Sequence, residues 1–210
     1  MKRVIYYFDG FNFYYGLREI CKSDKDWKRF YWIDFIALCE EFISSDQTLE
    51  CVKYFTSPPV NVNKKSRQSA LLNANKLING SRFEVVKGKY YTKNIKCNIC
   101  SGVFQTQEEK RTDVNISIQM LLDCFNNKVD KLVLVTADSD LINTVQTIKS
   151  QFPSKEVKIY FPPKRTSSEL FDLCKPVVYL ENNKSKFDKA VMNDIVTVGA
   201  KSYTKPKEWT

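Results

Sequence analysis

The sequence predicts an α/β fold in which a mostly parallel β-sheet carries helices on both faces. Short apolar runs rich in β-branched and aromatic residues alternate with amphipathic segments along most of the 210 residues. Such alternation is typical of strand–helix–strand units, whose strands lie parallel in one sheet. Ligands of these folds bind beyond the carboxyl ends of the strands. The candidate functional residues are therefore those that directly follow the predicted strands.

The predicted strands are short and end at turn residues. The first covers residues 4–8 and stops at Asp9-Gly10. The other strands are expected at residues 49–55, 83–86, 131–136 and 157–161, and residues 177–180 are compatible with one more. Helices are predicted between them, because apolar residues recur there at helical spacing. These helices cover residues 12–21, 33–43, 63–78, 113–125, 141–149 and 168–174.

Two segments carry a more specific expectation. The polar and aromatic residues 22–32 are predicted to form a loop. The helix at residues 113–125 should turn one apolar face towards the core. That expected face consists of Val114, Ile118, Leu121, Leu122 and Phe125.

The composition is that of one globular domain, with 43% hydrophobic and 27% charged residues. We expect a domain at residues 1–180 and an extension of unassigned role at residues 181–210. A basic excursion at about residues 87–109 should form a β-hairpin that carries Cys97 and Cys100. No signal-peptide pattern or membrane-length apolar stretch is present, so no membrane association is expected. The seven cysteines, an odd number found mostly in apolar patterns, favour a reducing cytoplasm.

The charge and the absence of histidine narrow the possible chemistry. A net charge of +9 favours polyanionic partners, nucleic acid first, although a solvated basic surface is the plain alternative. The chain has no histidine, which excludes catalytic triads, Cys–His pairs, paired-histidine ribonucleases and His-ligated zinc hydrolases. Acid–base work is left to carboxylates, Lys, Tyr, Cys or water activated by a metal.

Four aspartates follow predicted strands or begin predicted helices. Asp9 follows the first strand, Asp138 and Asp140 follow the fourth, and Asp113 opens a helix. If those two strands are neighbours, the parallel sheet should bring Asp9 to face the 138–140 turn. Clustered carboxylates repel one another unless a cation compensates, and oxygen ligands suit Mg²⁺ or Mn²⁺. Each acid taken alone could simply stabilise a turn or cap a helix. The metal site is therefore inferred from the position of all four acids at the same predicted edge of the sheet.

Three motifs resemble those of the NYN-domain branch of the PIN-like nuclease superfamily. Residues 9–12 are DGFN, residues 109–115 are EKRTDVN and residues 136–140 are TADSD. Their order and spacing extend the resemblance over residues 3 to about 161. The resemblance implies a Rossmann-like three-layer sandwich with a central, mostly parallel sheet. It also implies an acidic rim that binds Mg²⁺ or Mn²⁺ and cleaves RNA.

The resemblance assigns roles to individual residues. The implied metal-binding and catalytic acids are Asp9, Asp113, Asp138 and Asp140. The implied supporting residues are Asn12, Thr136 and Ser139, which would orient the acids, the turn or a ligand. The implied reaction is hydrolysis of an RNA phosphodiester bond. Members of the family vary in activity, so a non-catalytic module that binds RNA or a protein is the alternative.

Basic residues near the same rim are candidates for binding RNA. They are Lys64, Lys65, Arg67, Lys89, Lys110, Arg111, Lys164 and Arg165. In the excursion, lysines alternate with Tyr90 and Tyr91, a pattern that suits the stacking of unpaired bases. A hairpin with packed tyrosines and solvated lysines explains this pattern equally well. Contacts to phosphate would make binding salt-sensitive.

The pair Cys97 and Cys100 resembles half of a zinc knuckle. A structural zinc ion usually has four ligands, and the other cysteines are isolated in the sequence. A plain turn is therefore favoured over a zinc site, which would need acids, remote cysteines or a partner chain. The sequence leaves a homo-oligomer open.

Overall fold

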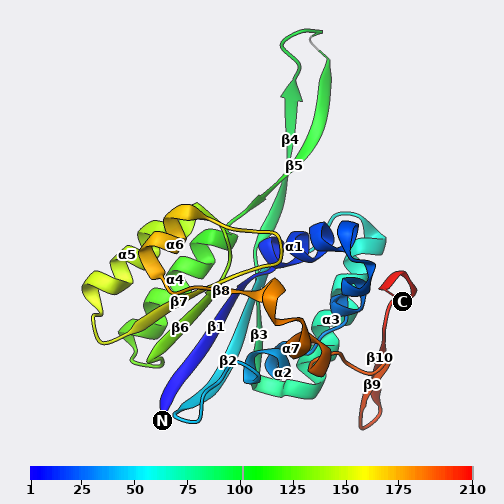
Figure 1. Ribbon diagram of the computed structural model, residues 1–210. Coiled ribbons are helices and arrows are strands. Elements are labelled where there is room, and N and C mark those ends of the chain that lie inside the picture. Colours follow the sequence, from blue (N-terminus) through cyan, green and yellow to red (C-terminus); the bar gives the residue numbers. More distant parts are fainter. Residues whose placement is uncertain (101, 210) are drawn as a thin grey trace.

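Six parallel strands form the centre of the molecule (Figure 1). The computed structural model describes residues 1–100 and 102–209, apart from the side chains of residues 90–92 and 106–110. The six strands are β1 (Lys2–Asp9), β2 (Gln47–Thr56), β3 (Phe83–Lys87), β6 (Lys131–Val135), β7 (Glu156–Phe161) and β8 (Val178–Tyr179). Their order across the sheet is β3-β2-β1-β6-β7-β8. The predicted parallel sheet is confirmed, and the chain reverses its direction of growth between β1 and β6.

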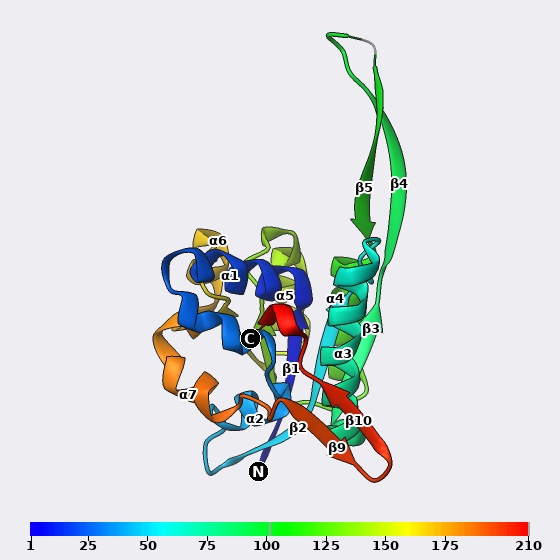
Figure 2. The same cartoon turned by 90° about the vertical axis from the view of Figure 1, so that its right-hand side faces the viewer.

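Helices cover both faces of the sheet and complete three layers (Figures 1 and 2). One face carries α1 (Gly10–Ser23), α2 (Phe35–Glu40), α3 (Val62–Asn79) and α7 (Lys184–Lys189). The other face carries α4 (Thr112–Phe125), α5 (Ile142–Gln151) and α6 (Ser168–Cys174). The Rossmann-like sandwich expected from the resemblance is therefore present. No helix within residues 1–100 and 102–209 is long and apolar enough to cross a membrane.

The side chains of β1 alternate between the two cores, as the pleat of a strand requires. Tyr6 and Phe8 pack with α1 and α2, whereas Ile5 and Tyr7 pack with α4. Since both faces are covered, β1 is buried continuously from Val4 to its end. A central position for this strand places its last residue deep in the carboxyl edge of the sheet.

Two further strands, β4 (Lys89–Lys96) and β5 (Val103–Lys110), pair antiparallel and project from the carboxyl edge of the sheet (Figures 1 and 2). We call residues 89–110 the arm. Cys97 and Cys100 lie in the connection between its strands, where the backbone N–H of Cys97 donates to the carbonyl of Gly102 at 2.8 Å. The arm leads from β3 into α4, so its base lies where the first turn of α4 begins.

The buried face of α4 differs from the prediction. The residues that pack on the sheet are Ile116, Met120 and Cys124. Four residues of the expected core face are 47–78% exposed, and they are Val114, Ile118, Leu122 and Phe125. The buried residues and the exposed apolar residues both recur at helical spacing. Periodicity alone therefore does not show which of the two faces is buried. The choice follows from Asp123, which is buried against partners on the sheet.

The segment predicted as a loop at residues 22–32 is also different. It contains the 3₁₀ helix η1 (Lys25–Tyr31), which buries Trp27 and Phe30 against α7. Burial of these rings requires a fixed backbone. The helix predicted at residues 33–43 is shorter than expected, because Asp34 caps it and α2 ends at Glu40.

The last segment folds back onto α3 (Figure 2). It contains the 3₁₀ helix η4 (Leu180–Asn183), the antiparallel strands β9 (Ile195–Val198) and β10 (Lys201–Thr204), and η5 (Lys207–Trp209). A separate small core there joins Trp32, Ala74 of α3, Met192, Val196 and Trp209. Two other 3₁₀ turns, η2 (Gly80–Arg82) and η3 (Ser139–Leu141), follow α3 and β6. The segment after residue 181 thus contributes side chains beside α1 and α3.

Candidate functional site

Asp9 is held at the junction of β1 and α1. Its Oδ1 accepts hydrogen bonds from the backbone N–H groups of Phe11 at 3.1 Å and Asn12 at 3.0 Å, so it caps α1. Its Oδ2 accepts from Asn12 Nδ2 at 2.7 Å and from Thr136 Oγ1 at 2.9 Å. Only 3% of Asp9 is exposed. Four donors therefore fix one buried carboxylate, and three of them belong to the expected supporting residues Asn12 and Thr136.

Thr136 connects the ends of two neighbouring strands. While its hydroxyl donates to Asp9, the same oxygen accepts from the backbone N–H of Asp138 at 3.0 Å. Asp138 in turn caps η3, since its Oδ1 accepts from the N–H of Asp140 at 3.0 Å. The turn after β6 is thereby tied to the end of β1.

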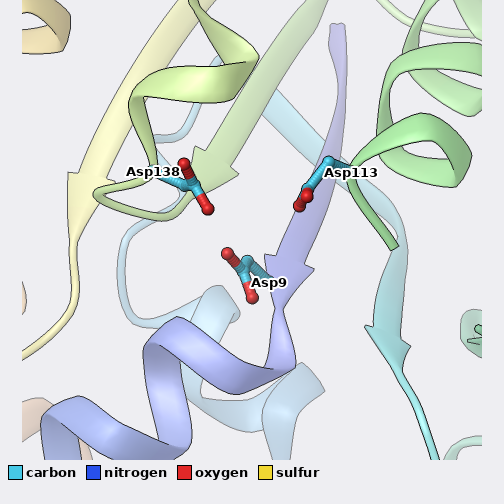
Figure 3. Close-up of side chains that lie close together, drawn as sticks. All are labelled: Asp9, Asp113 and Asp138. Carbon is cyan, nitrogen blue, oxygen red and sulfur yellow. The ribbon is translucent and has the colours of Figure 1, made fainter. Parts of the chain in front are cut away.

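Three aspartates converge at this edge (Figure 3). Asp9 follows β1, Asp138 follows β6, and Asp113 lies in the first turn of α4. Each offers one carboxylate oxygen, and these oxygens lie within 4.8 Å of one another. One hard cation of the Mg²⁺ or Mn²⁺ type, which binds oxygen at about 2.0–2.2 Å, could contact all three after small side-chain rotations.

The electrostatics of the cluster favour a cation. Burial, together with the negative charges of Asp138, Asp9 and Asp140, raises the pKa of Asp113 to about 6. Burial also raises the pKa of Asp9, against the opposing effect of its hydrogen bonds to Asn12 and Thr136. The charges that act most strongly on Asp113 are thus those of the other aspartates. Such mutual repulsion is relieved when a positive ion lies between the carboxylates.

Asp140 lies outside this group of three. Its backbone N–H binds Asp138, and the residue is exposed in η3. The exposed Ser139 beside it is equally outside the group. The structure therefore brings three of the four expected acids together, while Asp140 influences the cluster through its charge.

The expected basic residues do not gather in one patch. Lys64 and Arg67 line a cavity beside Asp9, and Arg67 Nη1 also pairs with Glu208 Oε1 at 2.6 Å. Lys164 pairs with Glu181 at 3.5 Å, and Arg111 begins α4 with a left-handed backbone at φ 84°. Three others are exposed: Lys65, Lys89 and Arg165. The side chains of Lys110, Tyr90 and Tyr91 lie outside the described part of the chain.

No sequence motif indicated the cavity beside Asp9. It measures about 310 Å³ and is lined by aromatic residues from α1, η1, β2 and η5. Its lining includes Tyr14, Tyr31, Tyr54 and Trp209. These residues lie outside the three sequence motifs. The density of aromatic residues at 11–15 and 30–32 was the available signal.

Cys97 and Cys100 are placed far from the aspartates, in the connection of the arm (Figure 1). The backbone N–H groups of Cys100 and Ile99 bond to the Cys97 sulfur and lower the pKa of its thiol. Among the described residues, the only group of three or more ligand-type side chains is the aspartate cluster. Two thiols are half of the four ligands that a structural zinc ion usually has, so the described residues assemble no complete zinc site around them.

Comparison with known proteins places this geometry in a family. The profile described as NYN domain matches residues 3–181. A protein of unknown function from Vibrio parahaemolyticus RIMD 2210633 has a solved structure with a TM-score of 0.57 to this chain. The two are 19% identical, and the match covers 91% of this chain and 96% of that one. This likeness concerns the fold alone.

A curated relative is known by an oxidative activity. The 6-hydroxy-3-succinoylpyridine 3-monooxygenase HspA of Pseudomonas putida (strain DSM 28022 / S16) is 27% identical over 181 aligned residues. The match covers 70% of this chain and 56% of that protein, so the chain spans little more than half of its relative's length.

Proposed function

Because this chain belongs to the NYN-domain family, which has a nuclease-like fold, we propose that it is a metal-dependent ribonuclease that hydrolyses RNA phosphodiester bonds. The observation that carries the proposal is the convergence of the Asp9, Asp113 and Asp138 carboxylates within 4.8 Å. They meet where β1 and β6 are neighbours and the strand order reverses. Open parallel sheets bind their ligands at that position.

The donor set fits Mg²⁺ or Mn²⁺. Three carboxylates supply hard oxygen ligands and leave coordination positions for water and phosphate. A divalent cation bound there would neutralise charge on the scissile phosphate and make a bound water more acidic. This chemistry requires no histidine, in agreement with the composition.

The protein's own residues position the reacting groups. Asn12 and Thr136 hold the buried carboxylate of Asp9, and Thr136 also fixes the turn that carries Asp138. Asp140 lies at the edge of the cluster and is proposed to accept the proton that the attacking water loses. The basic side chains of Lys64 and Arg67 are proposed to contact phosphates on either side of the cleaved bond.

The cellular setting follows from the cysteines. All seven are present as thiols. Free thiols, five of them in or beside the cores, are typical of proteins in a reducing compartment. We therefore propose the cytoplasm as the location, where RNA is available as substrate.

Oxidation of an aromatic ring is a second candidate function. It is favoured by the name of the Pseudomonas putida relative together with the cavity of about 310 Å³ lined by aromatic residues. The ribonuclease proposal is the better supported of the two, because the acids that converge beyond β1 and β6 are of the type that binds a hard cation.

Cleavage of a labelled single-stranded RNA with Mn²⁺ or Mg²⁺ tests the proposal. We expect Asp138→Asn to lower the rate by at least about 100-fold, because loss of a mere partner of a metal ligand already costs about 10–100-fold. Asp172→Asn is the matched control, since Asp172 is exposed on α6 and pairs only with Lys175 among the described ion pairs. Chelation with EDTA should abolish cleavage by wild type and control alike.

Two outcomes would contradict the ribonuclease. Equal cleavage by wild type and Asp138→Asn would assign the activity to a contaminant or to another site. Salt-sensitive binding of RNA without cleavage by either protein would establish the non-catalytic binding module instead.

A further inference from the structure

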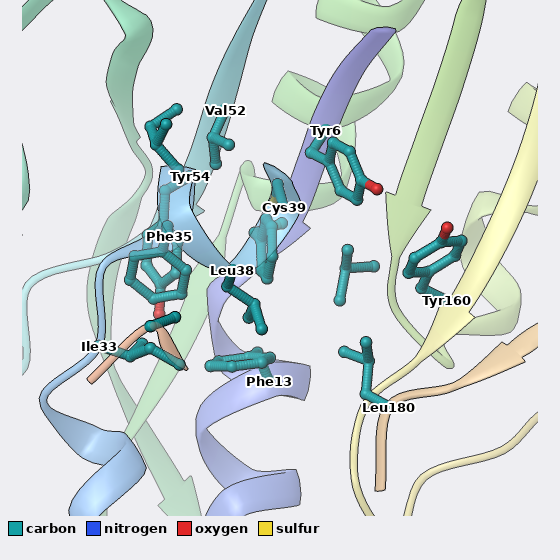
Figure 4. Close-up of a cluster of buried hydrophobic side chains, with 14 of the residues drawn as sticks. Tyr6, Phe13, Ile33, Phe35, Leu38, Cys39, Val52, Tyr54, Tyr160 and Leu180 are labelled. Atoms are coloured by element: carbon teal, nitrogen blue, oxygen red, sulfur yellow. The ribbon is translucent and has the colours of Figure 1, made fainter. Parts of the chain in front are cut away.

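The cavity beside the acidic site is shaped for one ring system. It lies between α1, η1, β2 and the start of α3, and Trp209 closes one side. Its volume of about 310 Å³ is at the lower end of the range for small-molecule sites, about 300–1,000 Å³. Phe13, Phe35 and Tyr54 form its inner wall and belong to the core shown in Figure 4. A rigid wall of this kind is formed before any ligand binds.

Several of the aromatic rings that line the cavity contact one another. Phe11 stacks with Tyr15 at a centroid distance of 6.3 Å, and Tyr14 contacts Tyr31 at 5.7 Å. Tyr31 in turn stacks on Trp209 at 5.7 Å with 23° between the planes. Tyr14 is 37% exposed although it is part of this series. The rings therefore hold one another in place and leave a ring face open to a ligand.

Three basic side chains line the cavity. Arg18, Lys64 and Arg67 line the cavity from α1 and α3. The amide of Gln68 lies on the same wall, where it donates to Thr56 Oγ1 at 2.9 Å. Aromatic faces beside basic side chains are the combination that binds single-stranded nucleic acid, because bases stack on the rings and phosphates meet the charges. A neutral aromatic metabolite could use the ring faces, but it would not use the positive charges of Arg18 and Lys64.

The cavity adjoins the acidic cluster through one residue. Gly10 lines the cavity and directly follows Asp9. The hydroxyl of Tyr54, on the cavity wall, donates to the carbonyl of Gly10 at 3.4 Å. A Cβ atom at position 10 would lie 2.6 Å from the Phe55 carbonyl oxygen, so only glycine permits this close approach. A nucleotide seated in the cavity would therefore place its backbone next to the three aspartates.

We infer that the cavity binds one unpaired base of a single-stranded RNA and thereby positions the adjoining phosphate at the aspartates. The inference rests on the proposed function of that site and specifies its substrate as unpaired RNA. It also makes Tyr14, Tyr31 and Trp209 determinants of binding without any role in the hydrolytic step.

Binding of a short fluorescein-labelled RNA, measured by anisotropy in EDTA at fixed salt, tests the inference without cleavage. We expect Tyr14→Ala to weaken binding by about 5–100-fold, the range for one stacked base, and Tyr14→Trp to preserve it. Phe171→Ala is the matched control, because Phe171 is also 37% exposed but lies on α6, which packs on the other face of the sheet. Circular dichroism melting of each variant verifies that it is folded.

A second probe identifies the base as the bound group. An RNA with one abasic position, moved stepwise along the strand, should lose affinity for the wild type at one position. For Tyr14→Ala, the affinity should not depend on the position of the abasic site. Uridine and adenosine 5′-monophosphates should compete with the RNA, whereas 3-hydroxypyridine should not.

The outcomes separate this inference from the ribonuclease. Equal affinity of the wild type, Tyr14→Ala and Phe171→Ala overturns the base site, whatever the cleavage assay shows. Competition by 3-hydroxypyridine alone, or no binding of RNA at all, also overturns it. Loss of affinity in Tyr14→Ala without any cleavage by the wild type supports the base site and refutes the ribonuclease.

Discussion

At the scale of single residues, one hydroxyl group organises the acidic cluster. Thr136 is fully buried, donates to Asp9 Oδ2 at 2.9 Å and accepts from the N–H of Asp138 at 3.0 Å. Two of the three converging acids therefore depend on it. Partners of this kind orient metal ligands and tune their affinity.

We predict that Thr136→Val, which keeps the shape of the side chain, weakens Mn²⁺ binding by about 10–100-fold. The physical reason is that Asp9 loses a donor and the 138–140 turn loses its anchor. Isothermal titration with Mn²⁺ measures the effect, and Thr136→Ser, which retains the hydroxyl, is the control. Wild-type affinity in the valine variant would show that the hydroxyl does not orient the acids.

The residue scale also shows where sequence reasoning succeeded and where it stopped. Asp9, Asp113 and Asp138 could be selected because each stands at a strand end or helix start, positions that a parallel sheet brings to one edge. Asp140 could not be separated from them, because only the 3₁₀ turn η3 decides which way each side chain points. Tyr14 and Trp209 stayed hidden, since their proximity depends on contacts over nearly 200 residues of sequence.

At the scale of elements, a buried ion pair fixes how α4 lies on the sheet. Lys53 of β2 donates to Asp123 Oδ2 at 2.6 Å, and Tyr7 of β1 donates to the same oxygen at 2.8 Å. Lys53 is 5% exposed and Asp123 is 1% exposed. Lys53 and Asp123 are 70 positions apart in the sequence. Their contact turns the Asp123 side of α4 towards the sheet, which is why the face predicted from periodicity was wrong.

We predict that Lys53→Met lowers the free energy of unfolding by about 3–5 kcal/mol, because it leaves the Asp123 carboxylate buried without its cation. Urea denaturation followed by circular dichroism measures the loss. The double variant Lys53→Met/Asp123→Leu should regain most of it, and adding Tyr7→Phe should remove the remaining unpaired hydroxyl. A double variant no more stable than Lys53→Met would show that the loss does not come from an unpaired Asp123 carboxylate.

At the scale of the whole molecule, the two halves of the sheet meet between β1 and β6. The carboxyl ends of these strands are joined through Thr136, and their other ends are joined by Arg3 and Asp130. Arg3 donates from its backbone N, Nε and Nη2 to the Asp130 carboxylate, each at 2.9 Å. Hydrogen bonds from the Arg3 side chain and backbone hold the pKa of Asp130 well below its ordinary value.

This contact should make the free energy of unfolding depend on pH in the acidic range. Because the pKa of Asp130 is lower in the folded protein than in the unfolded chain, its contribution is present above the ordinary aspartate pKa of about 4 and fades as the pH falls below it. We predict that Asp130→Asn costs about 1 kcal/mol at pH 7, since the pair is partly exposed.

Urea denaturation of both proteins at pH 7 and pH 2.5 checks the sign. The difference between wild type and Asp130→Asn should shrink at the lower pH, where the Asp130 carboxyl of the unfolded chain is protonated. A difference that is unchanged or larger at pH 2.5 would contradict the assigned direction. Asp172→Asn, on the surface of α6, should show no comparable change.

The overall architecture could be predicted from the sequence better than any smaller feature. Alternating strands and helices required the parallel sheet with two covered faces, and burial of β1 on both sides followed from its unbroken apolar run. The folding back of residues after 181 onto α3 was not accessible, because its small core is assembled from Trp32, Ala74 and Trp209. No local pattern reports such distant partners.

The position of β1 in the middle of the sheet also concerns how the protein is made. β1 is synthesised well before β6, which pairs with one of its edges and is completed only at residue 135. At about 5–20 residues per second, that edge waits on the order of ten seconds on the ribosome without its partner. An unpaired strand edge can pair with other chains. Because β1 lies in the middle of the sheet, its edge towards β6 stays open until β6 has been made, and Asp9 can meet Asp138 only after that point.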